Sequence, residues 1–113
     1  MVHINYEALN DLADVLEEDF PVIIDSFIAS SSNILDSIPP SLLIDDLNSF
    51  VIKIHSLKGS CRNIGAEYLA ELCMIDEVHA KKEQVDKVDP LLKEIRKEFE
   101  IVKKALLDYL STK

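Results

Sequence analysis

Residues 42–66 read LLIDDLNSFVIKIHSLKGSCRNIGA, and they carry the most regular hydrophobic pattern of the chain. Apolar side chains recur there at intervals of three and four residues, which is typical of a helix with one buried face. The positions of this stripe are Leu43, Leu47, Phe50, Ile54, Leu57, Cys61 and Ile64. Gly65 follows the last of them and suits the left-handed residue that often ends a helix. The stretch therefore predicts one long helix from about Leu42 to Ile64.

Three further segments show the same spacing. We expect long helices over about Phe20–Ile38, about Ala66–Gln84 and about Val88–Leu110. Their expected buried residues are, in turn, Phe20, Ile24, Phe27, Ile34 and Ile38; Leu69, Leu72, Cys73 and Ile75; and Val88, Leu92, Ile95, Phe99, Val102, Leu106 and Tyr109. Because short connections make successive helices antiparallel neighbours, the pattern predicts an antiparallel four-helix bundle.

A shorter helix precedes the four long ones. Asn5 is a suitable N-cap for it, and the helix is expected to end at about Glu17. Its apolar residues, which would cover one end of the bundle, are Leu9, Leu12 and Leu16. The predicted fold class is therefore all-α: an antiparallel four-helix bundle with a short additional N-terminal helix.

Length and composition agree with one compact helical domain. A chain of 113 residues with 48% apolar side chains supplies one hydrophobic core and is too short for two. We expect a single domain over residues 1–113, and its uninterrupted core favours a monomer. The longest apolar runs fall far short of the roughly 20 residues that span a bilayer. The first residues also lack the charged leader and apolar centre of a signal peptide, so we expect a cytoplasmic protein without membrane contact.

Charge is distributed unevenly along the chain, whose net charge is −9. Residues 1–52 contain ten acidic side chains and no Lys or Arg, a composition that would repel a nucleic acid backbone. The segment Leu47–Ala66 instead contains Lys53, Lys58 and Arg62 and no acid. This basic segment is either a solvated helix face or a docking surface for an anionic partner.

Neither the cysteines nor the histidines form a metal-binding pattern. Cys61 and Cys73 are expected to be buried thiols, because two cysteines make no disulfide framework in a chain without a secretory signal. With His55 and His79 they show none of the short pairings that closed zinc sites use. We therefore expect no metal and no cofactor of the protein's own.

His55 is the candidate functional residue of the long helix. It follows Ile54 and so lies about 100° around the axis from the buried stripe, which predicts an exposed imidazole. Gly59 falls one turn later on the same face. A glycine inside a helix costs about 0.5–1 kcal/mol relative to alanine, and its missing side chain leaves room for another molecule to approach. Most exposed helical histidines have no role, which is our interpretation of His3 and His79.

The stretch HSLKGSCRNIGA (residues 55–66), together with Leu69 and Leu72-Cys73, resembles the signature of histidine-containing phosphotransfer (HPt) domains. The resemblance covers nearly the whole chain, and residues 12–38 are similar to the bacterial stand-alone members. It implies a phosphorelay intermediate. His55 would accept a phosphoryl group from the aspartyl-phosphate of a receiver domain in a hybrid sensor kinase and pass it to the aspartate of a downstream response regulator.

The resemblance also implies roles for residues around His55. Lys58 would neutralise the phosphoryl oxygens, and Gly59 would give the partner steric access. The expected partner contacts are Val51, Ile52, Arg62, Glu77 and Lys81. Mg²⁺ would come from the receiver domain. Glu77 is a departure, because the family often carries a glutamine at this position; a carboxylate there could orient the imidazole but would repel phosphate.

Three other functions are alternatives to phosphotransfer. A sensor-kinase dimerisation domain places an acid directly after its histidine and a proline soon after; here Ser56 follows His55, and no proline lies between Pro40 and Pro90, so no ATP-dependent kinase activity is expected. A di-iron bundle oxidase needs two Glu-x-x-His pairs, and only Asp76-Glu77-Val78-His79 comes close. A helical adaptor that binds receiver or other domains without chemistry is the alternative function.

Overall fold

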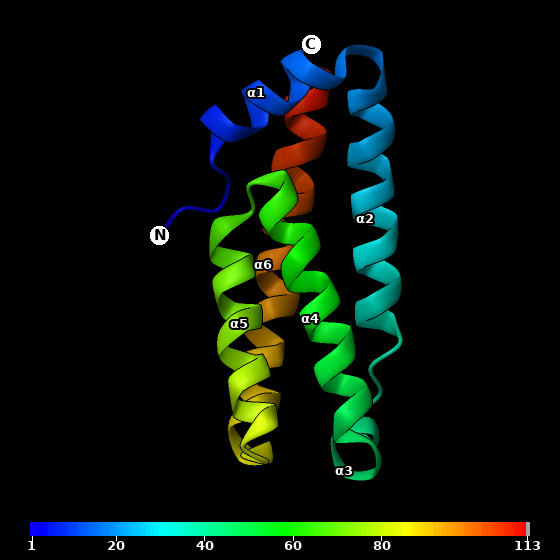
Figure 1. Ribbon diagram of the computed structural model, residues 1–113, viewed down its shortest axis with the longest axis vertical. Coiled ribbons are helices and arrows are strands. Elements are labelled where there is room, and N and C mark those ends of the chain that lie inside the picture. The colour runs from blue at the N-terminus through cyan, green and yellow to red at the C-terminus, as the bar shows by residue number, and fades with distance from the viewer. Residues whose placement is uncertain (113) are drawn as a thin grey trace.

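The computed structural model describes residues 1–112, except for the side chain of Ile44. These residues form helices and the turns between them: α1 (Tyr6–Leu16), a 3₁₀ turn η1 (Glu17–Asp19), α2 (Phe20–Asp36), α3 (Leu42–Asp45), α4 (Leu47–Ile64), α5 (Glu67–Lys81) and α6 (Val85–Ser111). Helices α2, α4, α5 and α6 run up and down the long axis of the molecule, and α1 lies across one end beside the C-terminus (Figure 1). The predicted all-α bundle with an additional N-terminal helix is confirmed.

The single long helix predicted from Leu42 to Ile64 is wrong at Asp46. The chain forms the one-turn helix α3, and α4 begins only at Leu47, because the backbone of Asp46 is not helical (φ −151°, ψ 70°). One carboxylate oxygen of Asp46 accepts a hydrogen bond from the backbone N–H of Ser49 at 3.1 Å, and the other accepts from the Ser49 hydroxyl at 2.6 Å. This N-cap starts a new helix, although Leu43 and Leu47 keep the apolar spacing across the break.

Other helix ends differ from the prediction by two to three residues. Helix α2 ends at Asp36 rather than Ile38, α5 ends at Lys81 rather than Gln84, and α6 begins at Val85 rather than Val88. Helix α4 ends at Ile64 as predicted, and Gly65 follows it in the left-handed conformation with φ 83°. A Cβ at residue 65 would lie only 3.2 Å from the carbonyl oxygen of Asn5. That position therefore favours glycine.

Most of the predicted stripe residues form the core, and four do not. The four half-buried exceptions are Ile34, Leu47, Ile75 and Tyr109. On α2 the buried positions after Phe27 are Ser31 and Leu35, because the buried stripe follows the helical period and leaves Ile34 at its edge. Helix α5 packs against both α4 and α6, so its buried face is wide enough to include Asp76 and Glu77.

The N-terminal residues attach α1 to the turn between α4 and α5. Asn5 caps α1 as predicted: its side-chain oxygen accepts from the backbone N–H of Ala8 at 3.0 Å. The Asn5 backbone N–H donates to the Gly65 carbonyl at 2.8 Å, and the Tyr68 N–H donates to the Val2 carbonyl at 2.9 Å. These bonds hold α1 over the end of α4.

Cys61 on α4 and Cys73 on α5 are buried free thiols, as predicted. A hydrogen bond with Cys61, together with burial, raises the pKa of the Cys73 thiol, which therefore stays protonated. No helix in residues 1–112 combines the length and the apolar character that crossing a membrane requires.

Candidate functional site

The outward face of α4 presents His55 to solvent. The His55 side chain is 65% exposed, whereas Ile54 and Leu57 on the core-facing side of the helix are completely buried. The exposure predicted from the spacing is confirmed. One turn later Gly59 lies in open space, because a Cβ built on it would have no heavy atom within 4 Å.

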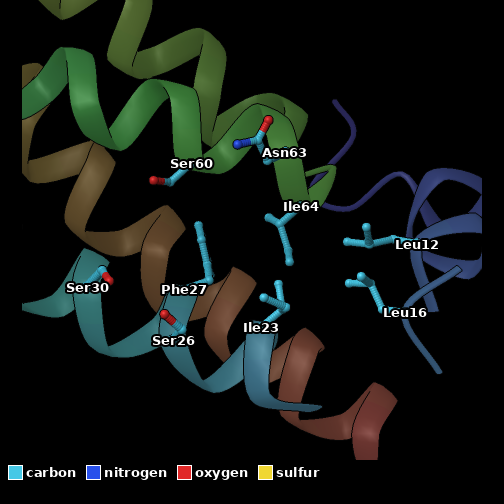
Figure 2. Close-up of a pocket in the computed structure, with 9 residues that line it drawn as sticks. All are labelled: Leu12, Leu16, Ile23, Ser26, Phe27, Ser30, Ser60, Asn63 and Ile64. Atoms are coloured by element: carbon cyan, nitrogen blue, oxygen red, sulfur yellow. The ribbon is translucent and has the colours of Figure 1, made fainter. Parts of the chain in front are cut away.

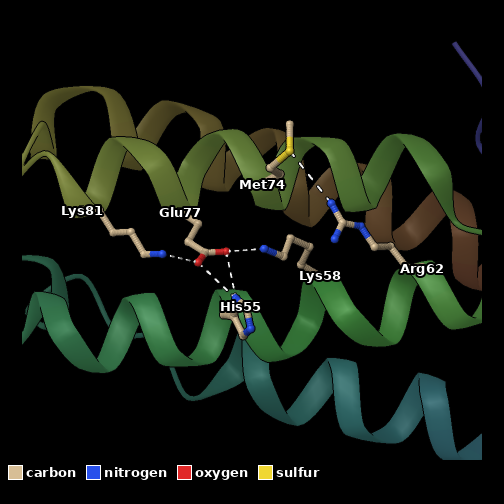
Figure 3. A network of polar contacts seen from close by, with 6 residues as sticks. All are labelled: His55, Lys58, Arg62, Met74, Glu77 and Lys81. Carbon is tan, nitrogen blue, oxygen red and sulfur yellow. Dashed lines mark hydrogen bonds and ion pairs between the residues drawn. The ribbon is translucent and has the colours of Figure 1, made fainter.

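The imidazole of His55 bonds to Glu77 on the neighbouring helix α5. Its Nδ1 lies 3.1 Å from Oε2 and 3.2 Å from Oε1 of Glu77 (Figure 3). Lys58 Nζ donates to Oε1 at 2.8 Å, and Lys81 Nζ lies 2.9 Å from Oε2. The Glu77 side chain is only 5% exposed. Two residues of α4 and two of α5 thus form one cluster.

The charge state of Glu77 determines the tautomer of His55. Burial opposes ionisation of Glu77, but the hydrogen bonds from Lys58, Lys81 and His55 more than offset it and lower its pKa to about 2. At neutral pH the carboxylate can only accept hydrogen bonds. Nδ1 of a neutral His55 must therefore carry the ring proton, so that Nε2 holds the free lone pair.

Lys58 lies deeper than its position beside His55 suggests. Its side chain is only 14% exposed, and its ammonium is directed at Glu77. Lys58 is therefore part of the support of the imidazole as well as a positive charge next to it.

The other predicted partner contacts are spread around His55. Ile52 is 70% exposed, whereas Val51 is half-buried. Val51 and Lys81 line the same groove of ≈ 450 Å³, which opens between the start of α4 and the end of α5. Arg62 is exposed and lies beside Met74, with 4.0 Å between its guanidinium nitrogen and the sulfur. In Figure 3, Arg62 is separated from the Glu77 cluster along α4.

His3 and His79, which the sequence presents as surface residues without a role, each have a structural partner. His3 Nδ1 lies 2.6 Å from a carboxylate oxygen of the buried Glu98, and His79 Nδ1 lies 3.2 Å from the Gln84 side-chain oxygen. Neither histidine joins the His55 cluster. The pairing of His3 with Glu98 joins residues 95 positions apart, so no local pattern could have indicated it.

An apolar groove of ≈ 360 Å³ borders the other flank of α4, and no pattern in the sequence indicates it. Helices α1, α2 and α4 contribute its lining: Leu12, Leu16, Ile23, Ser26, Phe27, Ser30, Ser60, Asn63 and Ile64 (Figure 2). The small side chains of Ser26, Ser30 and Ser60 leave space between α2 and α4. Since three separate helices form it, only the folded chain reveals the groove.

Comparisons with known proteins agree with this geometry. The Hpt domain family model matches residues 22–105. The phosphorelay intermediate protein rdeA of Dictyostelium discoideum is 31% identical over 87 residues, which are 77% of this chain and 34% of that protein. The chain thus spans about a third of the length of that relative.

Two solved structures are similar over almost the whole chain. Histidine-containing phosphotransfer protein B of Pseudomonas aeruginosa matches with a TM-score of 0.91 and 28% identity, covering 98% of this chain and 96% of that one. A putative histidine-containing phosphotransfer protein from rice matches with a TM-score of 0.83 and 18% identity, covering 96% and 82%, which shows a shared fold. The resemblance inferred from residues 55–66 is confirmed: the chain belongs to the Hpt domain family.

Proposed function

We propose that His55 accepts a phosphoryl group from the aspartyl-phosphate of a receiver domain in a hybrid sensor kinase and passes it to an aspartate in the receiver of a response regulator. One observation carries the proposal. The exposed imidazole of His55 has its Nδ1 bonded to the ionised carboxylate of Glu77, so Nε2 is the nitrogen that is left to react.

The transfer needs no base on this chain. The Nε2 lone pair of His55 forms a bond to phosphorus while the bond from phosphorus to the aspartyl oxygen breaks, and the electron pair leaves with that carboxylate. Nδ1 keeps its proton, so the phosphorylated ring is a cation that Glu77 stabilises across 3.1 Å. The same step in reverse, onto the second aspartate, restores neutral His55. In this proposal the receiver supplies the Mg²⁺ that screens the moving phosphoryl group.

The exposed face of α4 is the proposed docking surface. Open space at Gly59 lets the receiver approach the imidazole, and Ile52 offers an apolar contact beside it. The apolar groove between α2 and α4 continues this face through Ser60, and we propose that the same receiver extends over it. Arg62 and Val51 would form the polar and apolar edges of the interface.

The test is phosphotransfer profiling against the receivers of the source organism. Wild-type protein should take up phosphate from at least one phosphorylated receiver, and His55→Gln should take up none. His79→Gln is the control, because His79 contacts Gln84 rather than the His55 cluster. Phosphate on the His55→Gln protein would refute the assignment. Tight receiver binding without any phosphate uptake by the wild type would instead support the adaptor function.

A further inference from the structure

The ionised Glu77 carboxylate stabilises the cationic ring of phosphorylated His55, but it repels the negatively charged phosphoryl group that the ring carries. A phosphoryl group on Nε2 brings further negative charge to the far side of a ring that already contacts Glu77. Because Glu77 is buried, water screens this repulsion poorly. Positively charged groups that pair with the Glu77 carboxylate lower this repulsion.

The two lysines bind Glu77 from opposite sides. Oε1 accepts from Lys58 and is 3.2 Å from the imidazole Nδ1, whereas Oε2 pairs with Lys81 and is 3.1 Å from the same nitrogen. Each oxygen thus has one lysine, and both lie near Nδ1. Removing either lysine would let the carboxylate rotate away from the ring.

Lys81 differs from Lys58 in its surroundings. It comes from α5, four residues after Glu77, and its side chain is 61% exposed, whereas Lys58 is on the same helix as His55 and is nearly buried. In this arrangement the Lys81 ammonium contacts Glu77, and no contact joins it to His55. Any effect of Lys81 on His55 therefore passes through Glu77.

We propose that Lys81 is a positioning residue for phosphotransfer: by pairing with Oε2 of Glu77 it holds the carboxylate against Nδ1 of His55 and balances its charge. This inference rests on the proposed function of His55. It differs from the receiver contact expected from the sequence, because a direct contact would act whether or not residue 77 is charged, whereas positioning requires the Glu77 carboxylate.

The first test uses the unphosphorylated protein and is independent of phosphotransfer. Ring ¹⁵N chemical shifts of His55 should show the Nδ1–H tautomer in the wild type and in Lys81→Arg, and a shift toward mixed tautomers in Lys81→Met. In the Glu77→Gln background, Lys81→Met should cause no further change. Lys104→Met is the matched control, since Lys104 is an exposed lysine of α6 whose i,i+4 partner is Asp108 rather than Glu77. Identical His55 shifts in the wild type and Lys81→Met would overturn the proposal.

The second test is a double-mutant cycle on the transfer rate from one phosphorylated receiver. Lys81→Met should slow transfer about threefold when Glu77 is present, a size typical of an ion pair with one exposed partner, without changing receiver affinity. Lys81→Arg should restore the rate, and Lys81→Met should have no effect beside Glu77→Gln. Equal losses in both backgrounds would overturn positioning in favour of direct contact. If wild-type protein takes up no phosphate, the proposed function of His55 is wrong. The ¹⁵N chemical shifts of the single and double variants would still show whether Lys81 influences the His55 tautomer through Glu77.

Discussion

Nδ1 of His55 lies 3.1 Å from Oε2 of Glu77, across the interface between α4 and α5. The two residues are 22 positions apart, and one is exposed while the other is buried. The contact anchors the exposed imidazole, the proposed nucleophile, to the core without burying it. Pre-organisation of this kind lowers the entropic cost of aligning the reacting atoms.

Gly59 should control access of the receiver rather than stability. A Gly59→Gln side chain would project into open solvent and improve helix propensity, so the free energy of unfolding should stay constant or rise by about 0.5–1 kcal/mol. Transfer to His55 should be strongly slowed, because the added bulk lies one turn from the imidazole. Denaturant unfolding and transfer rates check both parts. Gly59→Ala is the control for propensity, and transfer at the wild-type rate in Gly59→Gln would show that the glycine has no steric role.

Acid should weaken the fold through Glu77. Burial opposes ionisation of this carboxylate, but its hydrogen bonds lower its pKa from 4.5 to about 2. Because the pKa of Glu77 is lower in the folded state than in the unfolded state, its ionisation stabilises the fold fully above the unfolded-state pKa. This stabilisation is lost as the pH falls from about 4.5, the unfolded-state pKa, to about 2, the folded-state pKa. Lys58→Ala removes one of the hydrogen bonds that lower this pKa, so the acid-dependent loss of stability should be smaller and should be complete at a higher pH.

Thermal unfolding midpoints measured between about pH 7 and about pH 2 test this shift. The matched control is Lys104→Ala, which removes an exposed lysine paired with Asp108. Parallel pH curves for the wild type and Lys58→Ala would show that the lysine does not stabilise the Glu77 carboxylate.

Asp76 should have the opposite pH dependence. It is completely buried, and neither carboxylate oxygen has a hydrogen-bond partner among the described residues. Burial, reinforced by the negative charge of Asp89, raises its pKa from 3.8 to about 7. The folded state therefore holds this proton more tightly than the unfolded state does, and stability falls as pH rises from about 3.8 to about 7.

The variant Asp76→Asn should remove this loss. Its gain in melting temperature over the wild type should be larger at about pH 8 than at about pH 4, since only the carboxylate can ionise. Asp108→Asn, an exposed carboxylate change on α6, is the control and should show no such difference. An equal effect of Asp76→Asn at both pH values would mean that Asp76 does not titrate in this range.

Receiver binding should combine a salt-sensitive and a salt-insensitive contribution. Arg62 is exposed at the edge of the proposed docking surface, so Arg62→Glu should raise the receiver Kd mainly at low ionic strength. Ile52 is an exposed apolar side chain beside His55, and Ile52→Asp should raise the Kd at every salt concentration. Titration calorimetry over a salt series measures both. Wild-type Kd values for both variants throughout would place the interface elsewhere on the bundle.

The helices of the bundle could be predicted because their pattern is local. The apolar stripe from Phe50 to Ile64 determines which face of α4 is buried, and the exposure of His55 follows from its angle to that stripe. Gly65 marks the end of the helix for an equally local reason, its positive φ. The break at Asp46 was missed because a side-chain cap can interrupt a helix without disturbing the apolar spacing.

Local pattern did not determine what surrounds His55. The sequence by itself established the helices, the outward histidine, the glycine one turn later and the family motif of residues 55–66. Only the tertiary structure decided that Glu77 is buried against that histidine between two lysines, that Asp76 is enclosed without a hydrogen-bond partner among the described residues, and that an apolar groove opens beside α4. The rotation of one helix against another depends on how all core side chains pack together, and spacing within a single helix does not contain that information.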